Sequence, residues 1–296
     1  MSLTVAIPLG VSSAVVYGTS IVVQHRMAQH HSDDNARASA AGLLRLVRSP
    51  LWLLSMLGDF FGFVLQIAAL SAGPVVVIQP LVVLMLPVAL IVSAVLGWHR
   101  PRAGDYFGVA AVLGGLGVFL GLIGNPGAVH LPKPHTLAET TAIVALAGVA
   151  ACVVVTGRNH IVRGAVYGGV AGVYFGGLAV MVDAAADQAS QAGLHGLFAT
   201  PRGLVPLIGG LLLGVGGMAL TQMSFQVGSL SATLPVNLAA DPLTAVVLGV
   251  AVLHERIPVS PAHIVAYVLC LAAVVAGAIR LADPKAGPIN PDERLE

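Results

Sequence analysis

Composition excludes an ordinary soluble domain, because 57% of the 296 residues are hydrophobic and 9% are charged, whereas about a quarter of a soluble domain is charged. The formal net charge is +1, and Arg and Lys are scattered between apolar runs, which excludes a basic face for nucleic acid. Cys152 and Cys270 lie within apolar runs, so neither a disulfide framework nor a zinc site is expected. We predict an all-α polytopic membrane protein surrounded by membrane lipid, with no cofactor.

Nine apolar runs are long enough to cross a bilayer, which requires about 20 residues in a helix. In chain order they cover residues 3–24, 51–70, 75–97, 104–123, 139–156, 162–182, 204–225, 229–253 and 260–280. No basic region precedes the first run and no small-residue cleavage site follows it, so we expect a retained span, not a secretory signal. The main segments between spans, 25–50 and 183–203, are too short to be separate domains.

The distribution of positive charge predicts the orientation of the chain. With the N-terminus outside and the C-terminus cytoplasmic, 11 of the 14 Arg and Lys residues lie on the cytoplasmic side, as the positive-inside rule requires. Only Lys133, Arg202 and Arg256 fall elsewhere. Trp52 and Trp98 lie at cytoplasmic span ends, where interfacial anchors are common. Frequent Ala, Val, Gly and Arg indicate a high-GC bacterium, so we expect its plasma membrane to hold the protein.

Two parts of the chain resemble each other, with residues 73–99 aligning to 228–254 at a constant offset of 155. The matched pairs are Gly73 and Gly228, Pro80 and Pro235, Pro87 and Pro242, and His99 and His254. Upstream matches are Gly62 with Gly217, Gly10 with Gly168, and Gly18 with Gly176. The alternative is a chance match between Gly-rich and Pro-rich helices.

The repeat predicts an inverted 4+1+4 arrangement of nine transmembrane helices, with a ten-helix arrangement as the alternative. Residues 1–123 form the first repeat, 124–160 a linker helix, 161–282 the second repeat and 283–296 a polar cytoplasmic tail. A single span between two four-helix units turns the second unit upside down. Inverted repeats are common in transporters and place the substrate site near the midplane.

The repeated prolines are predicted hinges. Proline removes a helical hydrogen bond and displaces a carbonyl, and in lipid such a carbonyl needs another partner. This expectation applies to Pro80 and Pro87 in the third span and to Pro235 and Pro242 in the eighth. A purely structural kink explains them equally well.

Two carboxylates occur inside apolar runs, where charge is costly and often functional. Asp59 lies about 12 Å and Asp241 about 18 Å from the cytoplasmic ends of their spans, within a core about 30 Å thick. We expect both in one cavity. Other candidate binding residues are the polar groups on the same or neighbouring helix faces, namely Tyr17, Gln66, Gln79, Gln222, Thr233 and Asn237. Alternatively, these polar groups only hold helices together.

Apart from Arg163 and Arg280 at span ends, the spans predicted above contain no Lys or Arg to pair with these carboxylates. Each is therefore protonated or neutralised by a mobile cation, which favours a proton, a metal ion or a cationic solute over an anionic substrate. Magnesium prefers oxygen ligands, so Asp59 and Asp241 are candidate metal ligands. The same groups would suit a proton-coupled exporter.

Three other clusters are weaker candidates. The stripe Gly168, Gly172 and Gly176 indicates close helix packing. The loop cluster His30, His31, Asp33 and Asp34 is better explained as solvated than as metal-binding. The residues ending the eighth span, His254, Glu255 and Arg256, fit an external gate or a plain interfacial cluster equally well.

Several short motifs resemble the drug/metabolite transporter (DMT, EamA-like) superfamily, and within it the NIPA-like magnesium transporters. They are Gly18-Thr19-Ser20 through Gln24, Ser49-Pro50-Leu51-Trp52, Gly58-Asp59, Gln79-Pro80-Leu81, and Glu255 after Gly249 to His254. Asp59 stands where the family has Glu. The resemblance implies an inverted-repeat carrier of nine or ten helices, and it supplies no set of coupling residues.

We therefore expect a transporter, not an enzyme, that moves Mg²⁺ or a small metabolite or drug by alternating access. A non-transporting membrane scaffold is an alternative. An intramembrane aspartyl protease is disfavoured because Ala240 precedes Asp241 and Met56 stands two residues before Gly58, where such proteases carry Tyr and Gly. The sequence leaves the coupling ion, the transport direction and a homodimer open.

Overall fold

The computed structural model describes residues 3–32, 50–98, 101–124, 132–227 and 230–281, and these contain helices and no strands. The elements are α1 (Leu3–Ser32), α3 (Pro50–Ala72), α4 (Val75–Ile78), the 3₁₀ helix η1 (Gln79–Leu84), α5 (Met85–Val95), α6 (Ala103–Ile123), α7 (Pro134–Val154), α8 (His160–Ala199), α9 (Pro201–Val227), α10 (Leu230–Val252) and α11 (Pro261–Leu281). Eight spans in the described part are long and apolar enough to cross a membrane, and Val236–Val252 is a shorter apolar helix. The all-α polytopic membrane fold is confirmed.

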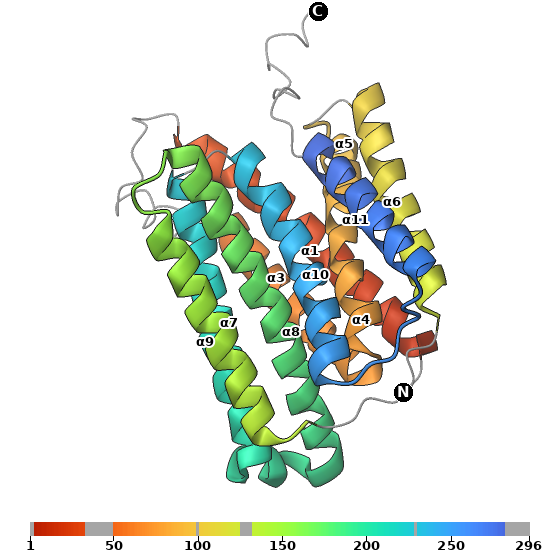
Figure 1. Ribbon diagram of the computed structural model, residues 1–296. Coiled ribbons are helices and arrows are strands. Elements are labelled where there is room, and N and C mark those ends of the chain that lie inside the picture. The colour runs from red at the N-terminus through yellow and green to blue at the C-terminus, as the bar shows by residue number, and fades with distance from the viewer. Residues whose placement is uncertain (1–2, 33–49, 99–100, 125–131, 228–229, 282–296) are drawn as a thin grey trace, which may run out of the picture.

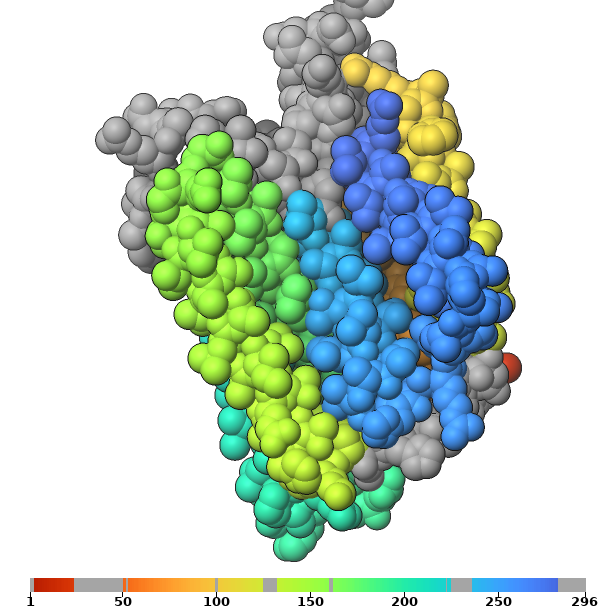
Figure 2. All heavy atoms as spheres, viewed as in Figure 1, coloured from red at the N-terminus to blue at the C-terminus, as the bar shows by residue number. Residues whose placement is uncertain are grey.

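The outer surface of the bundle is apolar, as contact with lipid requires. Large hydrophobic side chains are exposed on the peripheral helices, among them Phe60 on α3, Leu146 on α7, Leu211 on α9 and Leu269 on α11. Figure 2 shows one such face, formed by α7, α10 and α11, with orange atoms of the α3–α5 region visible between the last two. A lipid environment explains why this surface need not be polar.

Two spans form the centre of the bundle. In the most apolar stretch of α8, 61% of the residues are buried, and in the stretch that runs from α4 to α5 the share is 56%. In each of the other candidate spans of the described residues, at most 33% are buried. The long helix α8 packs against α9 and α10, while α1 packs against α3 and α11 against α6 (Figure 1). The central helices therefore position the polar groups of the protein interior.

The third span is not one regular helix. It begins as the single turn α4, tightens into η1 over Gln79–Leu84 and resumes as α5. Pro80 lies at the start of η1 and Pro87 near the start of α5, so the irregular backbone coincides with the prolines. By contrast, α10 continues as one α-helix through Pro235 and Pro242.

The segment after residue 182, which we expect to lie between two spans, is mostly helical. Helix α8 continues to Ala199, and Gly193 interrupts it with φ 65° and ψ −171°. The run Ala184 to Ala186 favours helix, and the apolar-run criterion ended at Asp183 only because that residue is charged. Figure 1 shows α8 extending beyond neighbouring helices before the chain returns through α9.

The tail 283–296 and the residues Asp33 and Asp34 lie outside the described part, as do the side chains of His30 and His31. The division into two four-helix repeats and a linker helix stays a prediction.

Candidate functional site

A buried chain of hydrogen bonds joins three of the predicted site residues. Gln79 Nε2 donates to Asp241 Oδ1 at 2.7 Å, and Gln66 Nε2 donates to Gln79 Oε1 at 3.2 Å. All three side chains are at most 9% exposed. Since Gln79 is the first residue of η1, the irregular third span places an amide between α3 and α10.

Gln66 has an unused acceptor at the end of this chain. Its Oε1 atom is buried and has no hydrogen-bond partner among the described residues. A buried amide oxygen without a partner is unusual and needs an explanation such as water or an ion. Gln66 Oε1 is therefore available as an oxygen ligand for a bound ion or water.

Tyr17 and Asp59 complete the candidate site. Tyr17 packs its ring on Gly62, where a Cβ atom would lie 3.2 Å from Tyr17 Cδ1. Ser13 donates to the Gly62 carbonyl at 2.8 Å, which holds α1 against α3. Tyr17 lies within electrostatic range of both Asp59 and Asp241. The structure thus brings two carboxylates, two amides and a phenol into one region.

Asn237, another predicted site residue, bonds to a neighbouring helix. Asn237 directs Nδ2 toward Thr221 Oγ1 of α9 at 3.5 Å, and Thr221 donates to the Gly217 carbonyl. The side chains of Gln222 and Thr233 lie outside the described residues. Asn237 therefore contributes to the contact between α10 and α9.

Close packing between α8 and α10 fixes the backbone around Asp241. A Cβ atom at Gly172 would meet the Asn237 carbonyl, and one at Gly176 would meet the Asp241 carbonyl. Small residues allow two membrane helices to approach this closely. The predicted packing role is confirmed for Gly172 and Gly176.

Equivalent positions of the proposed repeats make equivalent contacts with different chemistry. The Tyr17 ring packs on Gly62, and the Phe175 ring packs on Gly217 at 3.0 Å from the position of a Cβ atom. In the alignment Asp241 corresponds to Leu86, and Asp59 corresponds to Gly214. Each repeat therefore carries one carboxylate that has no counterpart in the other repeat.

Glu255 joins the loop after α10 to the N-terminus of α4. Its Oε1 accepts from Val75 N at 2.7 Å and its Oε2 accepts from Val76 N at 2.9 Å. Burial raises the pKa of Glu255, and the two backbone N–H groups partly offset this rise. Since Glu255 is only 3% exposed whereas His254 and Arg256 are exposed, it is not part of a plain interfacial cluster.

Asp183 is a buried carboxylate that the sequence analysis did not select. It is 1% exposed, and neither carboxylate oxygen has a hydrogen-bond partner among the described residues. Glu255 and Asp187 both interact with it electrostatically. The alanines that follow it were the available signal, because they predict a helix that continues past the charge.

The described residues offer limited protein ligands for a metal ion. They contain no group of three or more His, Cys, Asp or Glu side chains that could hold one. A cation at Asp59 and Asp241 would consequently need amide, hydroxyl or water oxygens as well. Such mixed oxygen ligation is usual for Mg²⁺, which keeps several of its waters.

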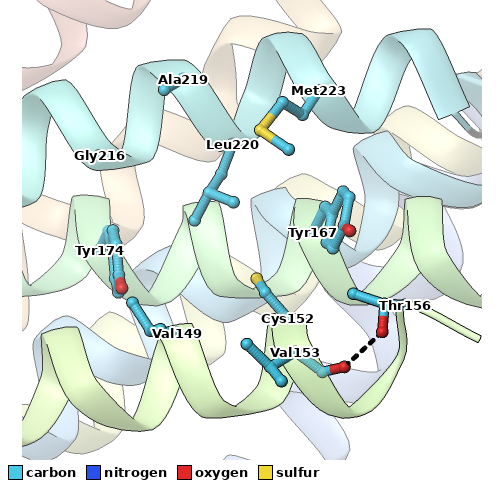
Figure 3. A pocket seen from close by; sticks show the side chains of 10 residues that line it. All are labelled: Val149, Cys152, Val153, Thr156, Tyr167, Tyr174, Gly216, Ala219, Leu220 and Met223. Carbon is cyan, nitrogen blue, oxygen red and sulfur yellow. Dashed lines mark hydrogen bonds between the residues drawn. The ribbon is translucent and has the colours of Figure 1, made fainter.

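An open groove of about 340 Å³ lies elsewhere, between α7, α8 and α9. Tyr167 and Tyr174 from α8 line it with Cys152 from α7 and apolar residues of α9 (Figure 3). The Tyr174 hydroxyl donates to the Ala145 carbonyl. The groove contains no carboxylate, so its chemistry differs from that of the candidate site.

The helical bundle and its buried polar centre define a polytopic membrane protein of transporter type. Residues 2–156, more than half of the chain, match the family described as magnesium transporter NIPA, and the chain belongs to this family. It is therefore a membrane transporter, and its membership of the family points to the cell membrane.

The chain is also 30% identical over 285 residues to an uncharacterized protein of Corynebacterium glutamicum. The similarity covers 93% of this chain and 94% of that protein. No solved structure matches the chain.

Proposed function

We propose that this protein moves Mg²⁺ across the cell membrane by alternating access, with Asp59 and Asp241 at the substrate site. The buried chain of Asp241, Gln79 and Gln66 is the observation that carries the proposal, because it ends in an unsatisfied amide oxygen. Its position in a chain of the NIPA family makes Mg²⁺ the first candidate.

The charge balance of the bundle supports a cationic substrate. In the described spans, the positive side chains Arg163, Arg202 and Arg280 lie close to helix ends. Asp241 is bonded to the Gln79 amide, and no Lys or Arg among the described residues contributes to its electrostatic environment. Two carboxylates near one apolar midplane are unfavourable unless cations compensate them, and a divalent ion compensates both.

Each residue has a separate task in this proposal. Asp241 and Asp59 supply negative oxygens, Gln66 supplies its free amide oxygen, and Tyr17 interacts electrostatically with both carboxylates. Gln79 orients Asp241 through its amide N–H group and links the site to the irregular third span. Waters kept by the ion fill the remaining ligand positions.

The two ends of the bundle differ in a way that supports alternating access. Asp59, nearer the end that we assign to the cytoplasm, is half-buried, whereas Gln66 and Gln79 further along are buried. At the opposite end Glu255 joins the loop after α10 to α4. We assign this arrangement to a state closed toward the outside.

Mg²⁺ binding by purified protein in detergent, measured by isothermal titration calorimetry, tests the assignment of the site. Asp241→Asn removes a charged ligand, and we expect Kd to rise at least about tenfold, since an interaction with a charged group contributes about 1.5–3 kcal/mol. Glu139→Gln on the exposed surface of α7 is the control and should bind as the unsubstituted protein does. Equal Kd values for all three proteins would contradict the assignment.

A proton-coupled exporter is the second candidate. The described residues lack a cluster of three metal-ligating side chains, and a proton needs only one carboxylate. Under this alternative, Mg²⁺ does not bind and a pH gradient drives efflux of a small solute.

A further inference from the structure

We propose that Asp183 is a proton-binding site, and that the contact between Glu255 and α4 closes it from the outer aqueous phase. The assignment does not depend on which solute the protein carries. It concerns a carboxylate separate from Asp241: Asp183 lies seven residues further along α8 than Gly176, which packs on Asp241, and interacts electrostatically with Glu255 in the loop that follows α10.

The surroundings of Asp183 leave no partner for a negative charge. The side chain is 1% exposed, and both oxygens lack a hydrogen-bond partner among the described residues. An isolated ionised carboxylate in an apolar interior costs so much free energy that such a group takes up a proton instead. The geometry therefore points to a neutral carboxylic acid.

Glu255 makes the asymmetry between two nearby carboxylates clear. Its carboxylate accepts two backbone hydrogen bonds, one from Val75 N at 2.7 Å and one from Val76 N at 2.9 Å. These donors lie at a helix N-terminus in the first turn of the third span and favour a negative charge on Glu255. Asp183 has no comparable donor, and the nearby Glu255 charge opposes ionisation of Asp183. Asp183 is thus the member of this pair that holds a proton.

No positive group on the packed elements offsets this effect. Asp187, one turn further along α8, interacts with Asp183 and adds negative charge, while its Oδ2 accepts from Gln191 at 3.3 Å. The helices packed against α8 are α3, α4, α7, α9 and α10. Helix α4 carries no titratable side chain, and the charged or titratable residues of the others are Asp59 on α3, His135, Glu139 and Cys152 on α7, Arg202 on α9 and Asp241 on α10. His135, Glu139 and Arg202 are exposed to the surroundings.

The contact made by Glu255 determines access to this proton. The Glu255 N–H group also bonds to the Gly249 carbonyl at 3.1 Å, and a Cβ atom at Gly249 would lie 2.6 Å from Glu255 Oε2. The carboxylate is consequently held between the end of α10 and the start of α4. Separation of these two elements would expose Asp183 to external water and allow proton exchange.

Infrared spectroscopy of the full-length protein in lipid nanodiscs at neutral pH tests the protonation state. We expect the carbonyl-stretch band of a protonated carboxylic acid, its loss in Asp183→Asn and its retention in Asp187→Asn. Asp183→Asn should fold, because Asn resembles the neutral acid in size. If it does not fold, Asp183→Glu replaces it and should shift the band. An unchanged band in the substituted protein would overturn the assignment.

Hydrogen–deuterium exchange of the same band tests the gate. Glu255→Gln removes the negative charge and replaces one of the two oxygens that accept from Val75 N and Val76 N by an NH₂ group. The Asp183 band should therefore shift faster after transfer to heavy water than in unsubstituted protein. Arg256→Gln, at the neighbouring exposed position, should leave the exchange rate unchanged. An exchange rate unaffected by Glu255→Gln would contradict the gating role.

Discussion

At the scale of single residues, Gln79 has the most connections within the site. It donates to Asp241 and accepts from Gln66 while being 5% exposed. Replacement by an apolar residue would leave two buried polar groups without these bonds. Removing one partner of a buried hydrogen bond costs about 1–3 kcal/mol, and more where the group left behind is charged.

We predict that Gln79→Leu lowers the free energy of unfolding by about 1–3 kcal/mol. The measurement is unfolding of the purified protein in detergent, followed by circular dichroism. Gln191→Leu serves as the matched control, since Gln191 is exposed and bonds to Asp187 at 3.3 Å, and it should change stability little. An equal decrease in the free energy of unfolding for both substitutions would show that the hydrogen bonds of Gln79 contribute no more to stability than those of an exposed residue.

The sequence indicated these polar residues but not how they connect. Asp59, Asp241, Gln66 and Gln79 stand out because polar groups are costly in apolar runs, and periodicity places them on helix faces. Which amide donates to which carboxylate depends on contacts between distant elements. Asp183 was missed for another reason, since a charged residue ends an apolar run whether or not the helix itself ends there.

At the scale of helices, glycines allow the approach of α8 to α10. A Cβ atom at Gly176 would lie 2.8 Å from Thr244 Cβ and even nearer to the Asp241 carbonyl, whereas a Cβ atom at Gly117 on α6 would have no atom within 4 Å. The repeated glycines were predicted as packing positions from their spacing alone. The irregular helix η1 was less predictable, because similar prolines leave α10 continuous.

We predict that Gly176→Ala destabilises the protein by about 1–3 kcal/mol, the usual range for overpacking. It should also weaken Mg²⁺ binding, because α10 carries Asp241. Gly117→Ala should not destabilise, since alanine favours helix over glycine by about 1 kcal/mol. Thermal unfolding in detergent compares the two substitutions, and a smaller effect at position 176 than at position 117 would contradict the packing account.

At the scale of the whole molecule, orientation in the membrane determines which end Glu255 closes. The positive-inside rule predicts that the loop after α10 is outside and that the loop between α7 and α8 is inside. Arg256 and Arg158 lie in these loops and are both exposed. They are therefore matched reporters for the two sides.

We predict that a membrane-impermeant maleimide added to intact cells labels Arg256→Cys but not Arg158→Cys. Both substitutions are made in a protein whose Cys152 and Cys270 are replaced by Ser. Permeabilised cells provide the control, in which both positions should react. The opposite pattern in intact cells would reverse the orientation and assign the Glu255 contact to the cytoplasmic end.

The central claim is that Asp241 forms part of a Mg²⁺ pathway, and ion flux into proteoliposomes containing a Mg²⁺-sensitive dye measures it most directly. We predict dye-detected influx with the unsubstituted protein, the same influx with Glu139→Gln, and at least about a tenfold lower rate with Asp241→Asn, since an interaction with a charged group is worth about 1.5–3 kcal/mol. Equal rates for Asp241→Asn and the unsubstituted protein, or no influx beyond that of empty liposomes, would contradict the claim.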